Sequence, residues 1–491
     1  MAKVKPRSEI RFLLNGEAVT LTDVAPDETL LDYLRLRRSL KGTKEGCAEG
    51  DCGACTVLVG RLHAGRLVYE GVNACIRFLG SLDCMHVVTV EHLKGEAGGL
   101  HPVQQAMVDF HGSQCGFCTP GFVMSLYGLW MCSPDPSNAE IEKALQGNLC
   151  RCTGYEAIMR AARAVSDYGK AAKDPLNAER EAVTARLAAL RDGARVEIAT
   201  GRGRLVVPAD ADDFAEVLEA EPKATVVAGS TDVGLWVTKH MRDISPVVFI
   251  AGLDGLKSVS ETGGVITIGA GVTYTEAFAV LAKRIPPLGA LIDRIGGEQV
   301  RNMGTIGGNI ANGSPIGDTP PPLIALGATL TLRKGGRRRT IPLENFFIAY
   351  GKQDRQPGEF VEAVHVPVPA SGSRFAVYKV TKRRDEDITA TLGAFHLRLA
   401  KDGTVEDIRI AYGGMAATPK RASAVEKALT GRAWNEAAVA AALPAFESDF
   451  APLTDMRATA AYRALAARNL LVRFHAETTG TREPLTVSRA A

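Results

Sequence analysis

Apolar and polar positions alternate along the first strands that the chain predicts. Residues 10–14 and 18–21 follow this pattern, and Asn15 and Gly16 between them suit a two-residue turn, so a β-hairpin is expected. The apolar positions that follow predict one helix and two strands, at residues 30–40, 56–59 and 66–69. This order indicates a compact β-grasp-like domain that ends near Val90.

Helical spacing replaces alternation over residues 102–172. Pro102 and Pro120 each stand where a first helical turn tolerates proline, because the N–H groups of that turn have no partner within the helix. Thr119 and Asn138 are expected to be N-caps. The segment therefore predicts a small domain of four short helices.

The remaining residues predict a mixed α/β pattern and then helices. Residues 173–197 are expected to form a charged, helical linker. Strands are then expected at residues 205–208, 225–228, 247–250, 327–332 and 362–368, with a helix at 212–220. The last segment predicts strands at 375–380, 393–399 and 408–413, followed by alanine-rich helices to about residue 477 and a disordered tail.

Length and composition place the chain among multidomain globular proteins of the α+β class. Its 491 residues exceed what one hydrophobic core supports. A net charge of +3 offers no electrostatic case for binding nucleic acid or an anionic membrane. The sequence contains no apolar run of the roughly 20 residues that span a bilayer and no apolar leader segment, so a cytoplasmic protein is expected.

All ten cysteines lie between Cys47 and Cys152, which favours metal binding over disulfides. In the first set, four residues separate Cys47 from Cys52, two separate Cys52 from Cys55, and nineteen separate Cys55 from Cys75. This is the spacing of plant-type ferredoxins, which hold a [2Fe–2S] cluster. Glycines around these cysteines allow the tight turns that such a loop needs. The alternative is a structural zinc site, although zinc sites favour paired C-x2-C knuckles.

The second set combines a C-x2-C pair with a C-x-C pair, formed by Cys115, Cys118, Cys150 and Cys152. Zinc is a stronger competitor here on local spacing alone. A neighbouring iron–sulfur cluster favours a second cluster, because electron carriers work in series. Two further cysteines, Cys84 and Cys132, are expected to be small buried hydrophobic residues.

The residues around these cysteines resemble the molybdenum hydroxylase (xanthine oxidase) family. The similar stretches are 45–55, Cys115 to Phe122 and Gly147 to Tyr155. The resemblance implies a β-grasp ferredoxin-like domain, a four-helix [2Fe–2S] domain, a two-subdomain α/β FAD-binding domain of the vanillyl-alcohol-oxidase/PCMH type and an α+β C-terminal domain. The implied limits are 1–92 and 93–172 for the iron–sulfur domains, 173–197 for the linker, 198–370 for the FAD-binding domain, 371–480 for the C-terminal domain and 481–491 for the tail.

Two stretches of the second half combine small and hydrogen-bonding residues. Residues 225–234 predict a strand running into a small-residue turn that suits a pyrophosphate, although such a turn is usually only a turn. Residues 304–318 read as a ligand-binding loop or as a surface loop, and neither stretch is a G-x-G-x-x-G Rossmann motif. The resemblance implies that both bind FAD, with Asp318 and Lys379 contacting the cofactor. The implied FAD residues are Val226, Val227, Ala228, Gly229, Ser230, Thr231, Asp232, Val233, Thr305, Gly308, Asn309, Ser314, Asp318 and Lys379.

The resemblance also implies a function. These residues include no molybdopterin domain, so the chain looks like the small subunit of a bacterial-type xanthine dehydrogenase. A molybdenum-binding large subunit is expected as its partner, in a heterotetramer of two small and two large chains. The partner would oxidise hypoxanthine and xanthine to urate, and this chain, which carries no catalytic residue for that step, would pass the electrons through two [2Fe–2S] clusters and FAD to NAD⁺. The alternatives are the same role with an aldehyde, carbon monoxide or aromatic substrate, and a zinc-stabilised protein without catalysis.

Overall fold

The computed structural model describes residues 5–94 and 98–480, so the predicted tail at 481–491 lies outside the described residues. The chain forms two compact units. Unit 1 contains the residues up to Asp254 together with Gly296–Gly304. Unit 2 contains Gly255–Ile295 and the described residues from Thr305 onward.

A five-stranded sheet begins unit 1 and confirms the predicted hairpin. Its strands, in the order β2-β1-β5-β3-β4, are Glu17–Leu21, Ile10–Leu14, His86–Val88, Thr56–His63 and Arg66–Asn73. Asn15 and Gly16 both have positive φ angles, 50° and 89°, as the predicted turn requires. Because β1 runs parallel to β5 and antiparallel to β2, the sheet has the β-grasp arrangement. The helix predicted at 30–40 ends early, as α1 (Leu30–Asp32) and a π-helical turn (Tyr33–Arg37).

Four helices follow, as predicted, at α2 (Pro102–Asp109), α3 (Thr119–Cys132), α4 (Asn138–Leu145) and α5 (Glu156–Tyr168). Both prolines lie in a first helical turn. The predicted N-caps are wrong by one residue. Ser137, not Asn138, caps α4, because its hydroxyl accepts from the N–H of Glu140 at 3.3 Å while the Glu140 carboxylate accepts from the N–H of Ser137. Cys118, not Thr119, is the N-cap residue of α3.

The segment predicted as a linker is helical and packed. It forms α6 (Pro175–Ala178) and α7 (Arg180–Leu190), and α7 buries Val183 and Leu187 against leucines of the first sheet. A second sheet of unit 1 follows, in the order β6-β7-β9-β8: Val196–Thr200, Gly203–Val207, Val247–Phe249 and Thr225–Val227. Its helices are α8 (Ala211–Ala220) and α9 (Val233–Thr238), and α12 (Glu298–Arg301) also belongs to unit 1.

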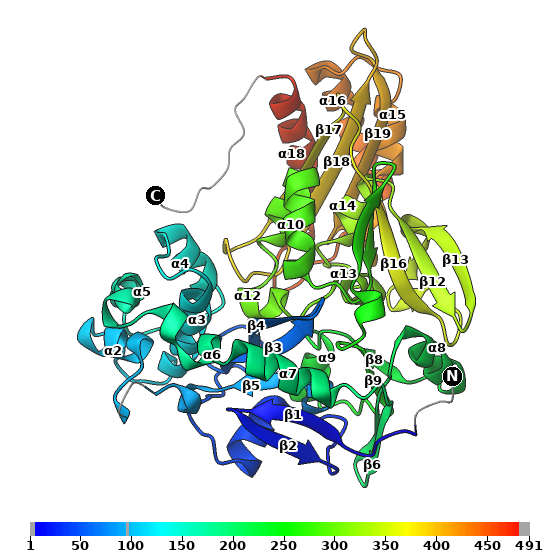
Figure 1. Cartoon of the computed structure of the whole chain (residues 1–491). Helices are drawn as coiled ribbons and strands as arrows, with labels where there is room; N and C mark the ends of the chain where they lie inside the picture. The colour runs from blue at the N-terminus through cyan, green and yellow to red at the C-terminus, as the bar shows by residue number, and fades with distance from the viewer. Residues whose placement is uncertain (1–4, 95–97, 481–491) are drawn as a thin grey trace. The chain divides into compact units, whose positions relative to one another are not determined.

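Unit 2 holds two sheets and their helices (Figure 1). The first sheet is antiparallel, in the order β10-β11-β16-β12-β13: Val259–Thr262, Val265–Gly269, Phe360–Pro367, Thr329–Lys334 and Arg337–Pro342. Its helices are α10 (Tyr274–Arg284), α11 (Pro286–Ile292), α13 (Ile306–Asn312) and α14 (Pro320–Ala325). A short ribbon is formed by β14 (Phe347–Ala349) and β15 (Lys352–Gln353).

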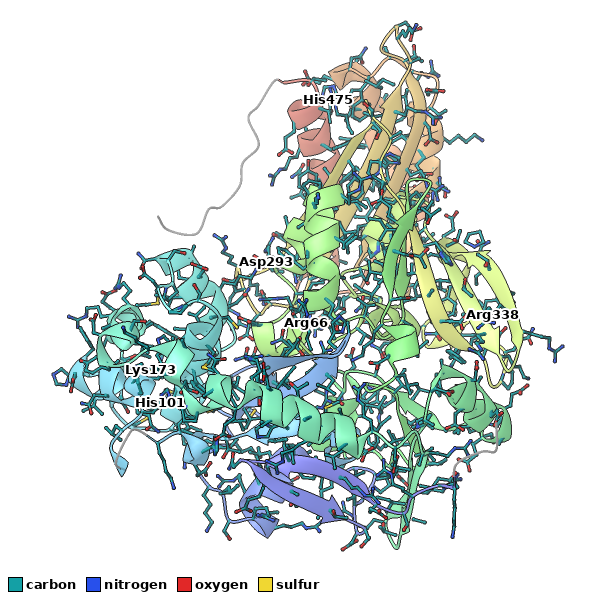
Figure 2. All side chains as sticks on the ribbon, in the orientation of Figure 1. Arg66, His101, Lys173, Asp293, Arg338 and His475 are labelled. Atoms are coloured by element: carbon teal, nitrogen blue, oxygen red, sulfur yellow. The ribbon has the colours of Figure 1, made fainter. Side chains whose placement is uncertain are left out.

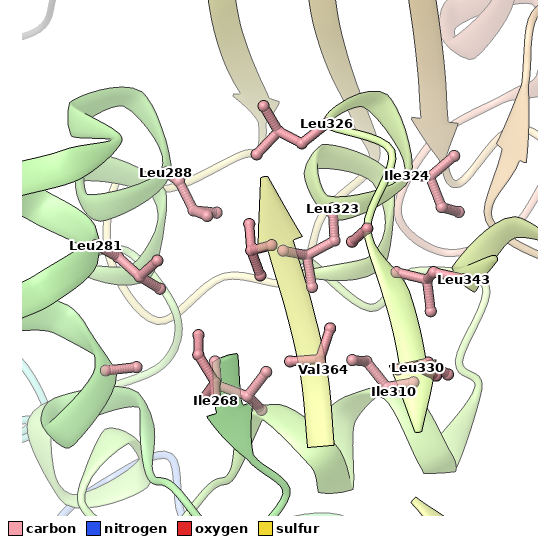
Figure 3. Packing of buried hydrophobic residues seen from close by; sticks show 14 of the residues in the cluster. Ile268, Leu281, Leu288, Ile310, Leu323, Ile324, Leu326, Leu330, Leu343 and Val364 are labelled. Atoms are coloured by element: carbon pink, nitrogen blue, oxygen red, sulfur yellow. The ribbon is translucent and has the colours of Figure 1, made fainter. Parts of the chain in front are cut away.

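Apolar side chains from these helices and strands form one core, in which Leu281 of α10, Leu323 of α14 and Val364 of β16 are buried together (Figure 3). The second sheet comprises β17 to β20, Arg374–Val380, Thr391–Leu399, Val405–Gly413 and Lys420–Arg421. The alanine-rich sequence forms the predicted helices, α15 (Ser423–Leu429), α16 (Glu436–Ala442), α17 (Phe446–Asp449) and α18 (Ala460–Thr478). The α+β multidomain class is therefore confirmed. Over the described residues, no helix is both long and apolar enough to cross a bilayer.

Candidate functional site

The first cysteine loop lies between the π-helical turn and β3, and left-handed backbone angles wind it tightly. Gly50 and Gly53 have φ angles of 80° and 67°, which glycine adopts without strain. A Cβ at Gly46 would lie 2.8 Å from the sulfur of Cys52, so only glycine fits there without displacing that side chain. The N–H of Cys52 points to the sulfur of Cys47 at 3.4 Å. The loop therefore brings small residues and a backbone N–H close to its sulfur atoms.

Three contacts link the four thiols of the first set: Cys47 contacts Cys52 and Cys75, and Cys75 also contacts Cys55. The contact with Cys52 lowers the pKa of Cys47, and the contact with Cys75 lowers the pKa of Cys55. The contact with Cys47 raises the pKa of Cys52, and the contacts with Cys47 and then Cys55 raise the pKa of Cys75. Because a metal is bound by the thiolate, four converging thiols are a donor set suited to a positively charged iron centre.

The second set pairs its cysteines across the two motifs. Cys118 contacts Cys150, and Cys115 contacts Cys152. Burial and the contact with Cys150 raise the pKa of Cys118 to about 12. Cys115 and Cys152 are exposed, whereas Cys150 is buried. The second set thus reaches the surface of unit 1.

In the described part of the chain, no three His, Cys, Asp or Glu side chains are grouped as the ligands of a single metal ion. A two-iron cluster instead divides four cysteines between two iron atoms. The four linked thiols of the first set fit this donor arrangement, and so do the two pairs of the second set, Cys118 with Cys150 and Cys115 with Cys152.

The two remaining cysteines differ from the expectation. Cys132 is exposed, at the last position of α3, so its predicted burial is wrong. Cys84 is half-buried, and its thiol points to Asp83 Oδ2 and to the carbonyl of Leu190, both at 3.4 Å. Burial and the neighbouring Asp83 raise the pKa of the Cys84 thiol to about 12. Counting cysteines along the sequence could not separate these two environments, because burial depends on how the helices pack.

Backbone contacts join the two cysteine loops. The N–H of Leu149, directly before Cys150, donates to the carbonyl of Cys52 at 3.0 Å. A Cβ at Gly53 would lie 2.1 Å from the carbonyl oxygen of Gly147, and one at Gly121 would lie 2.2 Å from the carbonyl oxygen of Gly53. The two loops therefore touch backbone to backbone, which larger residues at these positions would prevent.

The first of the two predicted FAD stretches lies in unit 1, between β8 and α9. Ser230 occupies the turn with a φ of 65° and is only 4% exposed. Its hydroxyl is buried and has no hydrogen-bond partner among the described residues. A Cβ at Gly229 would lie 1.9 Å from the carbonyl oxygen of Met303, so this turn requires glycine. An unsatisfied buried hydroxyl in a small-residue turn fits a bound phosphate oxygen.

The second predicted stretch lies in unit 2 from Thr305 onward, and its residues Ile306–Asn312 form a helix where a loop was expected. Thr305 caps α13, because its hydroxyl accepts from the N–H of Gly308 at 2.9 Å. Gly313 ends the helix with a φ of 65°. A Cβ at Gly307 would lie 2.5 Å from the Cα of Ala270, so the helix packs directly on the backbone of its neighbour. Gly307, one of the glycines that indicated a loop, is therefore needed for this close packing.

The polar residues that follow α13 are held in place by hydrogen bonds. Asn309 Oδ1 accepts from the hydroxyl of Thr319 at 2.5 Å, and the Ser314 hydroxyl accepts from the N–H of Ile316 at 3.4 Å. Lys379 Nζ donates to Asp318 Oδ2 at 2.7 Å, and the other carboxylate oxygen of Asp318 accepts from the hydroxyl of Thr389.

Lys379 would be a surface lysine by default, but its side chain is only 3% exposed. The structure thus brings Asp318 and Lys379 together in unit 2, as one buried ion pair. Sequence reasoning missed Thr389, and also Arg294, whose carbonyl accepts from Lys379 Nζ at 3.1 Å. Neither residue belongs to a motif that could have indicated it.

Four protein-family models match the chain, in an order that follows its sequence. A 2Fe-2S iron-sulfur cluster binding domain matches residues 12–78, and a [2Fe-2S] binding domain matches residues 89–163. The FAD binding domain in molybdopterin dehydrogenase matches residues 199–369. The CO dehydrogenase flavoprotein C-terminal domain matches residues 376–478.

Curated relatives match most of the chain. The xanthine dehydrogenase/oxidase of Gallus gallus is 33% identical, over 92% of this chain and 39% of the relative. The xanthine dehydrogenase of Emericella nidulans is 31% identical, over 90% of this chain and 36% of the relative. The chain therefore spans less than two fifths of the length of these relatives.

A solved structure of a carbon monoxide dehydrogenase from Hydrogenophaga pseudoflava, which lacks the Mo-pyranopterin moiety of its molybdenum cofactor, is similar to part of the chain. It is 30% identical with a TM-score of 0.52, and the match covers 54% of this chain and 93% of that one. From the cysteine sets, the ordered domain models and these relatives, it follows that the chain belongs to the molybdenum hydroxylase (xanthine oxidase) family, of which it carries the [2Fe–2S] and FAD-binding electron-transfer part.

Proposed function

We propose that this chain is the electron-transfer subunit of a xanthine dehydrogenase. It receives electrons from a molybdenum cofactor on a large partner subunit, passes them through two [2Fe–2S] clusters to FAD, and delivers them to NAD⁺. Two copies of each subunit form the complex. The observation that carries the proposal is the convergence of eight cysteines into two sets of four, whose loops are joined by the hydrogen bond from Leu149 to Cys52.

The ligands of the first cluster are Cys47, Cys52, Cys55 and Cys75, and those of the second are Cys115, Cys118, Cys150 and Cys152. When bound, the clusters supply one-electron steps, and the flavin exchanges electrons with them and a hydride with NAD⁺. Backbone N–H groups and small residues around the sulfurs would determine the polarity of the cluster's surroundings and thereby its reduction potential.

The second set faces the partner in this proposal. Cys115 and Cys152 are exposed, and three large apolar side chains beside this set, Phe117, Leu149 and Tyr155, are 48%, 39% and 39% exposed. Exposed apolar side chains around a redox centre suit a surface that another protein covers. Cys55 and Cys75 of the first set are buried, which suits a centre inside the chain.

The FAD contacts come from three places. The turn from Val226 to Val233 holds the pyrophosphate, with the unpaired hydroxyl of Ser230 as a donor. The proposed contacts to the remainder of the cofactor lie in unit 2, at Thr305, Gly308, Asn309 and Ser314. The ion pair between Asp318 and Lys379 holds these two side chains in place, and both are proposed to contact the cofactor.

The choice of xanthine as substrate rests on the curated relatives. These are a xanthine dehydrogenase/oxidase and a xanthine dehydrogenase, and each match covers about nine tenths of this chain. A second candidate, carbon monoxide as the substrate, is favoured by the solved structure of a carbon monoxide dehydrogenase, because the match covers 93% of that chain. In both cases the partner selects the substrate, and this chain performs the same electron transfer.

The test is anaerobic reduction of the purified chain, alone and in complex with its molybdenum-binding partner. The expected protein is brown, and NADH bleaches both its flavin and its iron–sulfur absorption. Hypoxanthine or xanthine bleaches them only in the complex. A colourless protein that releases two zinc ions would overturn the redox proposal. A flavin that another donor reduces and NADH does not would exclude NAD⁺ as the acceptor, and a complex reduced by carbon monoxide and not by xanthine would favour the second candidate.

A further inference from the structure

A short segment from the second half of the sequence belongs to unit 1. Residues 296–304 return to this unit after the chain has entered unit 2, and their helix α12 packs on β4 and α4 (Figure 1). Asn302 Nδ2 donates to the carbonyl of Gly71 at 2.9 Å, and Arg301 donates to Gln146 Oε1 at 2.8 Å. The segment thus contacts both the ferredoxin-like domain and the helical domain.

Gln299 lies at the centre of this contact and is 2% exposed. Its Nε2 lies 3.1 Å from the hydroxyl of Thr56, 3.3 Å from the hydroxyl of Ser125 and 3.0 Å from Asn148 Oδ1. Thr56 directly follows Cys55, and Asn148 lies two residues before Cys150. One amide therefore donates to residues beside both cysteine loops.

The acceptors of Gln299 are themselves oriented by one another. The Thr56 hydroxyl donates to the carbonyl of Gly53 at 2.6 Å, and Asn148 Nδ2 donates to the same carbonyl at 3.2 Å. The Ser125 hydroxyl donates to Asn148 Oδ1 at 2.7 Å. Because both hydroxyls use their hydrogens in these bonds, they can only accept from Gln299. The network therefore requires an N–H donor at position 299.

The space around Gln299 is also fixed. A Cβ at Gly147 would lie 2.0 Å from Gln299 Oε1, so the amide rests directly on the backbone that leads to Cys150. The same backbone supplies the N–H of Leu149, which donates to the carbonyl of Cys52 at 3.0 Å. This bond is the direct link between a residue of the first cysteine set and the chain that carries the second.

We propose that Gln299 is a positioning residue that fixes the two cysteine loops against each other and thereby maintains the Leu149–Cys52 bond between them. The inference deepens the proposed function and rests on it, because electron transfer between two clusters depends on a fixed separation of their loops. The positioning group comes from neither iron–sulfur domain. It lies in the segment that directly precedes Thr305, so the flavin-binding part of the sequence sets the geometry of the iron–sulfur part.

The test compares Gln299→Met with Gln299→Leu, because both side chains are similar in size to glutamine and neither has an N–H or O–H donor. Gln105→Met is the matched control, because the Gln105 side chain donates to Asp109 on the same helix, α2, away from the cysteine loops. Hydrogen exchange of a peptide containing Leu149 measures the link between the loops. Electron paramagnetic resonance of the fully reduced holoprotein measures the magnetic interaction between the two clusters, which depends on their separation.

Both Gln299 variants are expected to exchange the Leu149 amide about tenfold faster than the wild type, as the loss of one ordinary hydrogen bond gives. At unchanged iron content, their electron paramagnetic resonance spectra should show a smaller or broadened splitting from the magnetic interaction between the clusters. Gln105→Met should match the wild type in both measurements. Wild-type exchange and wild-type splitting in both Gln299 variants would overturn the inference. If the wild-type chain itself shows no cluster signal, the proposed function fails, while the exchange of Leu149 still decides whether Gln299 positions the loops.

Discussion

At the scale of single residues, burial and pairing separate the side chains proposed to contact FAD from others of the same type. Lys379 and Asp318 form an ion pair whose side chains are 3% and 11% exposed. Lys382, three residues along, is a surface lysine that donates to the carbonyl of Met456. The sequence alone treats these two lysines alike, because it contains no signal for the burial of one ammonium group.

Replacing Lys379 by methionine should destabilise unit 2. The variant leaves the carboxylate of Asp318 buried without its cation, and breaking a buried pair in this way costs about 3–5 kcal/mol. Urea unfolding of the purified protein, followed by flavin fluorescence and circular dichroism, measures this loss. Lys382→Met serves as the control and should change the free energy of unfolding by less than about 1 kcal/mol. Equal effects from both variants would show that the Asp318–Lys379 pair has no special role.

At the scale of helices and strands, hydrogen bonds at helix ends decide where elements begin. His101 caps α2, and Asp174 caps α6 by accepting from the N–H of Leu176 at 2.9 Å. His101, labelled in Figure 2, donates through Nε2 to Asp174 at 2.8 Å. The Tyr127 hydroxyl donates to the same carboxylate at 2.7 Å, so these bonds join the two caps to α3. The sequence predicted these helices correctly because their apolar spacing is local. It placed the N-caps of α3 and α4 one residue late, at Thr119 and Asn138, and predicted none for α2 or α6, because a cap depends on which side chain reaches back to the helix.

The Asp174 cap should make the helical domain sensitive to acid. Burial raises the pKa of Asp174, but the hydrogen bonds from His101, Tyr127 and Leu176 outweigh it, and the pKa in the folded protein is lowered. A lowered pKa means that the cap contributes stability above the unfolded value of about 3.9 and loses that contribution as the pH falls through the folded value.

Unfolding of the wild type and of Asp174→Asn, followed between pH 7 and pH 3, should therefore converge at low pH. The variant should be less stable near neutrality. Glu142→Gln on α4, for which no side-chain hydrogen bond is recorded among the described residues, is the matched control and should follow the wild type. A constant difference between wild type and Asp174→Asn at every pH would contradict this assignment.

At the scale of the whole molecule, segments far apart in the sequence complete each unit. Residues 296–304 join unit 1, where Met303 lies against Gly229 and Gln299 lies against the cysteine loops. The first hairpin, the four helices and several strands of the later domains followed from sequence patterns, whereas strands β6, β10, β11 and β13 and the order of the strands in the sheets did not. The return of this segment did not, because its residues form only one short helix and carry no periodic pattern.

Replacing Gly229 by alanine should disturb the predicted pyrophosphate turn through this long-range contact. The new methyl group would meet the carbonyl oxygen of Met303 at 1.9 Å, and a backbone atom cannot move aside cheaply. The expected loss of stability is about 1–3 kcal/mol, with reduced FAD content in the purified protein. Gly252→Ala is the control, since no atom lies within 4 Å of its added Cβ. Full FAD content and wild-type stability in Gly229→Ala would contradict the expectation.

The sequence by itself determined the eight cysteines, their division into two sets and the order of the domains. It could do so because a cluster loop and an amphipathic element are built from residues close together along the chain. Only the tertiary structure decided that Cys132 is exposed, that residues 306–312 form a packed helix, and that Gln299, Thr389 and Met303 contact the sites. These contacts join segments that have no common pattern, and packing around a shared core brings them together.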